Sequence, residues 1–242
     1  MNFYFQIFKQ VIQKIRADLI LIVPFTMFYF CFYTFSVISP LSLFTNESVN
    51  ISNLLVIILL WIVELFIKCI VIMWDHLKSL KNAYHHVRTQ FFKLIMALLI
   101  TLTPIGLIFT LLLKESISSI SFLQPLILIL ILFLIAPIII LNHFLPVIFL
   151  LKSISIQQGI QGIVTLFESK INQAIYYVIF VMLISTSAMM IVFMLNQVPL
   201  IGKSILVGIF QGGLATTMAL FSLEVFRQLS NKKNKNNTNE IS

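Results

Sequence analysis

The stretch WIVELFIKCIVIMW, from Trp61 to Trp74, is apolar except for Glu64 and Lys68. A tryptophan stands at each end, where membrane-spanning helices often carry aromatic residues at the lipid–water boundary. The surrounding apolar run, 52–74, has the length of about 20 residues that crosses a bilayer. The stretch therefore predicts a membrane-spanning helix that contains one acid and one base.

The composition of the whole chain extends this prediction. Of the 242 residues, 60% are hydrophobic and 10% are charged, whereas soluble domains are roughly 45–50% apolar and about 25% charged. We expect an all-α, polytopic membrane protein with a single transmembrane domain over 1–228 and a disordered polar tail over 229–242. The apolar runs predict six membrane-spanning helices, at residues 19–40, 52–74, 92–113, 121–141, 173–195 and 204–226.

The cations are distributed unevenly between the two sides of these spans. Thirteen of the 16 lysines and arginines fall in segments on one side, against two on the other, Lys114 and Lys203, and one within a span, Lys68. Cytoplasmic loops carry such an excess, so we expect both termini in the cytoplasm and the protein in the cell membrane. The cationic loops, which account for the net charge of +8, would then face the lipid bilayer. No nucleic acid is expected as a partner, because no stretch outside the apolar runs combines basic and aromatic residues.

A repeated unit is visible in the segments that lead into the first, third and fifth spans. Apolar residues recur at i, i+3, i+4 and i+7 in segments 4–15, 77–91 and 156–167, with polar residues such as Lys14 elsewhere on the helix surface. This pattern predicts amphipathic helices that lie at the membrane interface. The fold would then be three helical hairpins, each preceded by one interfacial helix, as expected from threefold internal duplication.

The fourth apolar run is too long for one straight span and contains Pro137 and Pro146. Because proline ends or kinks helices, we expect this span to end near Leu141. Asn142 would then lie at the cytoplasmic interface, and residues 144–151 would turn along the membrane surface. A single long, tilted span is the alternative.

Glu64 and Lys68 are the most informative polar residues within the spans. They are four residues apart and so share one helix face, with the acid first, which favours an intrahelical ion pair. Two interpretations stay open: an intramembrane site that serves transport or proton coupling, or a pair that neutralises itself at a helix–helix contact. Gln211 and Asn142 are further candidates for an intramembrane polar site.

The last span carries a stripe of small residues at intervals of four: Ser204, Gly208, Gly212 and Thr216. Such a stripe lets two helix backbones approach closely. It predicts helix packing, either within the chain or between subunits.

Signals for catalysis or cofactors are lacking. The segment that contains Asp75, His76, His85 and His86 has metal-binding residue types, but their spacing favours a solvated cytoplasmic linker over a metal site. There is no phosphate-binding loop, no zinc-protease motif and no nucleophile elbow. We therefore expect a protein that is not an enzyme and has no cofactor or bound metal.

The stretch from Phe144 to Phe180, with Pro146, Gly159 and Gly162, resembles bacterial six-span membrane families. Examples are the membrane domain attached to some glycerophosphodiester phosphodiesterases and the YesL-like proteins. These families often have an acidic residue or alanine where this chain has Gln161. The resemblance implies a membrane accessory role; the sequence holds no counterpart of the phosphodiesterase catalytic domain, so that chemistry is not expected.

Three classes of function follow from these observations. The first is a non-enzymatic accessory or scaffold protein that contacts another membrane protein or a second copy of itself. The second is a small-solute transporter or permease subunit that uses Glu64 near the middle of the membrane. The third, an enzyme that acts on lipid, has no motif in its favour.

Overall fold

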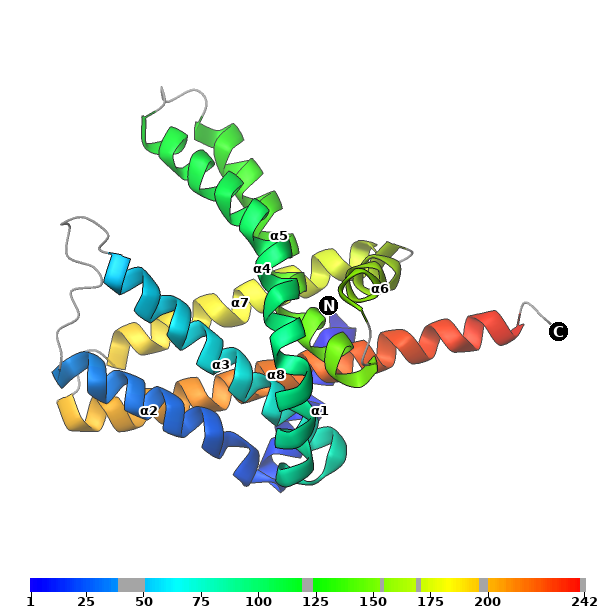
Figure 1. Cartoon of the computed structure of the whole chain (residues 1–242), viewed down its shortest axis with the longest axis horizontal. Coiled ribbons are helices and arrows are strands. Elements are labelled where there is room, and N and C mark those ends of the chain that lie inside the picture. The colour runs from blue at the N-terminus through cyan, green and yellow to red at the C-terminus, as the bar shows by residue number, and fades with distance from the viewer. Residues whose placement is uncertain (39–50, 119–123, 153–154, 169–170, 196–199, 240–242) are drawn as a thin grey trace. The chain divides into compact units, whose positions relative to one another are not determined.

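The computed structural model describes residues 1–38, 51–118, 124–152, 155–168, 171–195 and 200–239. Every regular element in these ranges is a helix, which confirms the predicted all-α class (Figure 1). The helices are α1 (Asn2–Ala17), η1 (Leu19–Ile22), α2 (Val23–Ile38), α3 (Ile51–Leu77), α4 (Leu80–Ser118), α5 (Gln124–Lys152), α6 (Ile156–Glu168), α7 (Ile171–Leu195) and α8 (Leu200–Asn239). The predicted turn at 39–50 lies outside the described residues.

Several of these helices are long and apolar enough to cross a membrane. Within the described residues there are four such segments: Leu80–Ile105, Leu134–Lys152, Ile171–Leu195 and Ser204–Ser230. The bent pair Asn2–Ala17 and Leu19–Thr34 would make a fifth if it formed one span. This set is compatible with an integral membrane protein that crosses the bilayer several times.

The helix α1 has the predicted amphipathic character. Tyr4, Ile7, Val11 and Ile15 are buried along one stripe, and the Tyr4 ring lies edge-on to that of Phe221 on α8, with 6.2 Å between centroids. The chain then turns by 103° between α1 and the helical segment that follows Asp18. This turn gives α1 and α2 different directions, as expected for one helix along a membrane surface and one across it.

The helix α6 is likewise separate and amphipathic. Its start is fixed by Ser155 and Gln158, which form a capping box: Ser155 Oγ accepts from the Gln158 N–H at 3.3 Å, and Gln158 Oε1 accepts from the Ser155 N–H at 3.1 Å. α6 packs against α5. Gly159 is required there, because a Cβ at this position would overlap the ring of Phe149.

The second predicted interfacial helix is not a separate element. The chain turns once, at Lys78, which has a φ of 55°, and Ser79 then caps α4 by accepting from the Asn82 N–H at 3.4 Å. From Leu80 the helix continues without a break into the apolar run. The physical reason is that no glycine or proline separates the amphipathic part from the apolar part before Pro104.

The predicted end of the fourth span near Leu141 is also wrong. α5 continues through Pro137 and Pro146 to Lys152 as one 29-residue helix. Each proline removes one backbone hydrogen bond, but neighbouring turns keep theirs, and apolar surroundings favour the helix because unpaired peptide groups are costly there. The alternative, a single long span, fits this helix better.

Contacts divide the chain into two compact units. The first consists of Asn2–Val87 and Leu183–Val225, and the second of Arg88–Met182 and Phe226–Ser242 together with Met1. In the first unit α2 packs along α3 (Figure 1). α8 extends to Asn239, but side chains are described only as far as Ser230, and the single domain with a disordered tail stays a prediction.

Candidate functional site

Three charged residues lie on one face of α3. Lys68 follows Glu64 by four residues and Asp75 follows it by 11, which is about three helical turns. At about 1.5 Å per residue, Glu64 and Asp75 are roughly 16 Å apart along the axis. The two carboxylates therefore point the same way from different levels of the helix.

Asp75 binds two lysines. Lys14 Nζ on α1 donates to Asp75 Oδ2 at 2.7 Å, and Lys78 Nζ donates to Oδ1 at 2.9 Å. The Asp75 side chain is 0% exposed, against 35% for Lys14 and 68% for Lys78. These three residues, the charged junction, join α1 to the end of α3.

The local backbone explains why Lys78 is in place. Lys78 adopts a left-handed conformation and its N–H donates to the Trp74 carbonyl at 2.8 Å, which closes the last turn of α3. A positive charge at this point also interacts favourably with the carbonyl end of the helix.

Two opposing effects set the pKa of Asp75, which follows the predicted span 52–74. Burial would raise the pKa, because it removes water from the carboxylate. The hydrogen bonds and charges of Lys14 and Lys78 outweigh burial and hold the pKa below its usual value. Asp75 is therefore ionised at neutral pH, and the junction carries one negative and two positive charges.

The predicted solvated linker is wrong for Asp75, which is buried and bound to Lys14. Lys14 lies outside the buried stripe of α1, as predicted, and is partly exposed. One signal existed: Lys14 follows Ile7 by seven residues and so lies beside the apolar stripe of α1. His76 and His85 are exposed, and the described residues contain no group of three potential metal ligands.

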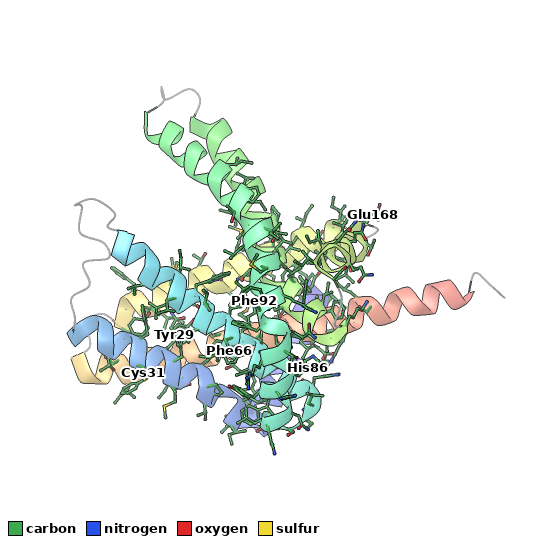
Figure 2. All side chains as sticks on the ribbon, in the orientation of Figure 1. Tyr29, Cys31, Phe66, His86, Phe92 and Glu168 are labelled. Carbon is green, nitrogen blue, oxygen red and sulfur yellow. The ribbon has the colours of Figure 1, made fainter. Side chains whose placement is uncertain are left out.

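Glu64 has a different kind of partner. Tyr29 Oη on α2 donates to Glu64 Oε1 at 2.7 Å, and Figure 2 shows Tyr29 between α2 and α3. Sequence reasoning did not identify Tyr29, because it lies in an aromatic run, FYFCFY, with no periodic signal to distinguish it. The contact joins α3 to α2 through a hydrogen bond in apolar surroundings, where unpaired polar groups are costly.

The other predicted polar residues are distributed over both units. Lys68 on α3 and Gln211 on α8 belong to the same compact unit as Glu64, whereas Asn142 on α5 belongs to the other. All three are partly buried. The ion pair between Glu64 and Lys68 stays a prediction.

The small-residue stripe of α8 faces α2 of the same chain. A Cβ on Gly208 would lie 3.1 Å from the Phe30 backbone, and one on Gly212 would lie 2.5 Å from the Thr26 backbone. Farther along, Thr216 is fully buried and its hydroxyl lies 3.4 Å from the Leu21 carbonyl; Ser204 at the other end is also buried. The two backbones thus approach more closely than side chains at these glycines would allow.

In the second compact unit a polar contact joins α5 to α7. His143 Nδ1 and Tyr177 Oη are 2.7 Å apart. Beside them Phe144 packs against Tyr177, with 4.8 Å between ring centroids, and against Phe167 of α6 at 5.2 Å. This cluster holds α5, α6 and α7 together.

Compared with protein-family models, curated proteins and solved structures, the chain matches none of them.

Proposed function

We infer that the chain is an integral protein of the cell membrane with six spans, both termini in the cytoplasm, and a non-enzymatic accessory or scaffold role. The spans correspond to η1 with α2, and to α3, α4, α5, α7 and α8. This arrangement puts the charged junction on the cytoplasmic side, together with most of the lysines and arginines. α1 would then lie on the cytoplasmic surface of the membrane.

The observation that carries the scaffold role is that each described carboxylate on α3 binds a neighbouring helix. Asp75 is bound by Lys14 of α1 and Glu64 by Tyr29 of α2. A carboxylate held by a structural partner is fixed in place, whereas a transport site needs groups that can exchange partners with a substrate or a proton. These contacts support a rigid membrane body that presents surfaces to a partner.

Cysteine labelling tests the topology. In a background with Cys31→Ala and Cys69→Ala, single cysteines are introduced and labelled with an impermeant reagent in intact cells. Cysteines at Glu47, Lys114 and Lys203 should be labelled from outside. Labelling of a cysteine at Lys81 or Ser230 from outside would overturn the topology.

A small-solute transporter is the second candidate, and one observation favours it. On α2, the helix that carries Tyr29, the hydroxyl oxygens of Thr26 and Thr34 are buried and have no hydrogen-bond partner among the described residues. Unpaired hydroxyls on the helix whose Tyr29 binds Glu64 could bind a polar solute. In this account Glu64 would exchange Tyr29 for the solute or release a proton during transport.

Substitution of Glu64 distinguishes the two candidates in a complemented deletion strain. Glu64→Gln keeps the shape and loses the titratable charge. The scaffold account expects any growth defect to follow the amount of folded protein in the membrane, and expects Glu64→Gln with Lys68→Gln to restore that amount if the two form a pair. Loss of complementation by Glu64→Gln, with a normal amount of folded protein in the membrane, would instead establish the transporter.

A further inference from the structure

A cavity of about 260 Å³ lies in the second compact unit, between the end of α5, α6 and the part of α8 that begins at Phe226. Lys152 contributes a positive charge to its lining, and Thr165 and Ser230 contribute hydroxyl groups. Ile148, Leu166 and Phe226 form apolar walls. The lining contains no acidic residue, so the cavity suits a negatively charged group with an apolar flank.

Lys152 is held beside one of these walls. Its Nζ lies 5.8 Å from the centre of the Phe226 ring, within the range of a cation–π contact. Its hydrocarbon stem can pack on apolar surface while the ammonium group reaches an anion. The nearby Thr165 hydroxyl donates to the Gly162 carbonyl at 3.3 Å, so its oxygen is still able to accept a hydrogen bond.

The two glycines of α6 have different surroundings. A Cβ at Gly159 would overlap Phe149, so packing alone requires this glycine. A Cβ at Gly162 would meet Ile148 at 3.7 Å, an ordinary contact. Packing therefore does not require Gly162. The lack of a side chain at Gly162 leaves open space in the cavity wall.

We propose that this cavity binds the phosphate-bearing headgroup of an anionic phospholipid. The proposal rests on insertion in the membrane as described above, but not on the scaffold role. Lys152 ends the apolar helix α5. The proposed topology puts this end at the cytoplasmic surface, at the depth of the headgroups and on the side with anionic lipid. The volume is slightly below the 300–1,000 Å³ or so of drug-sized pockets, so it fits a headgroup with the acyl chains outside.

Native mass spectrometry of the full chain in neutral detergent tests this proposal. The probes are phosphatidylglycerol, phosphatidylcholine and inorganic phosphate, titrated separately. Wild type should retain phosphatidylglycerol in preference to phosphatidylcholine. Lys152→Gln should weaken phosphatidylglycerol binding by about fivefold to tenfold, the loss expected for one charge-assisted contact, and Lys152→Arg should keep most of it.

Two further variants distinguish binding in the cavity from attraction to net charge and from an effect on folding. Lys93→Gln removes the charge of an exposed lysine outside the cavity lining and should bind as wild type does. Gly162→Ala puts a methyl group into the cavity without a clash and should weaken binding while thermal stability is unchanged or higher.

The other outcomes overturn the proposal. Equal loss in Lys152→Gln and Lys93→Gln would show attraction to net charge alone. Binding of inorganic phosphate without phosphatidylglycerol would show a soluble anion site. Extraction of the protein from membranes by carbonate would instead contradict the proposed membrane protein itself, independently of the lipid titration.

Discussion

The end of α3 and its middle are joined to neighbouring helices by different means. At the end, the charged junction links Asp75 to Lys14 and Lys78 through ionic hydrogen bonds, with both lysines partly exposed. In the middle, a neutral hydroxyl of Tyr29 binds Glu64, and α2 is in turn packed against glycines of α8. Ion pairs join the helices where water can reach the cations. Where the surroundings are apolar, a hydrogen bond from a hydroxyl and close contact between helix backbones join them instead.

We expect the largest loss of stability from a substitution at the contact between α2 and α8. Gly212→Ala places a Cβ 2.5 Å from the Thr26 backbone, which forces the helices apart. We expect a loss of about 2–3 kcal/mol in the free energy of unfolding, as found for overpacked cores. Thermal unfolding in detergent measures it.

The matched control is the next residue. A Cβ at Gly213 meets nothing within 4 Å, so Gly213→Ala should leave stability unchanged or raise it by up to about 1 kcal/mol through helix propensity. Equal destabilisation by both variants would show that loss of glycine flexibility, rather than contact with α2, is responsible.

The charged junction should contribute less to the free energy of unfolding than the close contact between the backbones of α2 and α8. Asp75→Asn removes the acceptor charge for both lysines, which can then turn toward water because they are partly exposed. Solvent screening reduces the value of the two bonds, so we expect a loss of about 1–2 kcal/mol. A melting temperature equal to that of wild type would show that α1 is held by its apolar stripe alone.

The charged junction also predicts that thermal stability depends on pH. The pKa of Asp75 is lowered on folding, so its stabilisation is complete above the unfolded value of about 3.9 and is lost as pH falls through the folded value. Between pH 6 and pH 3, wild type should therefore lose more thermal stability than Asp75→Asn does. Parallel curves for the two proteins would contradict the lowered pKa.

The sequence predicted the helical class and most helix positions because hydrophobic periodicity and run length decide them locally. It also identified Gly208 and Gly212, since spacing by four residues is visible in one helix. It failed at α5 because the effect of Pro137 and Pro146 depends on surroundings that are not local. It failed at the start of α4 because an amphipathic segment and an apolar span can share one continuous helix.

The partners of the two carboxylates were beyond reach of the sequence for a related reason. Lys14 and Asp75 are 61 residues apart, and Tyr29 and Glu64 are 35 apart. Spacing within one helix pointed to Lys68 as the partner of Glu64. The contacts across helices depend on how α1 and α2 turn at Asp18, which no local pattern specifies.

A double-mutant cycle between Tyr29 and Glu64 tests most directly the claim that Glu64 serves to join helices. The variants are Tyr29→Phe, Glu64→Leu and both together, each unfolded thermally in the same detergent. We expect Tyr29→Phe to lower the free energy of unfolding by about 1 kcal/mol in wild type and to have almost no effect when residue 64 is leucine. An equal effect of Tyr29→Phe in both backgrounds would contradict it, because the hydroxyl would then act independently of Glu64.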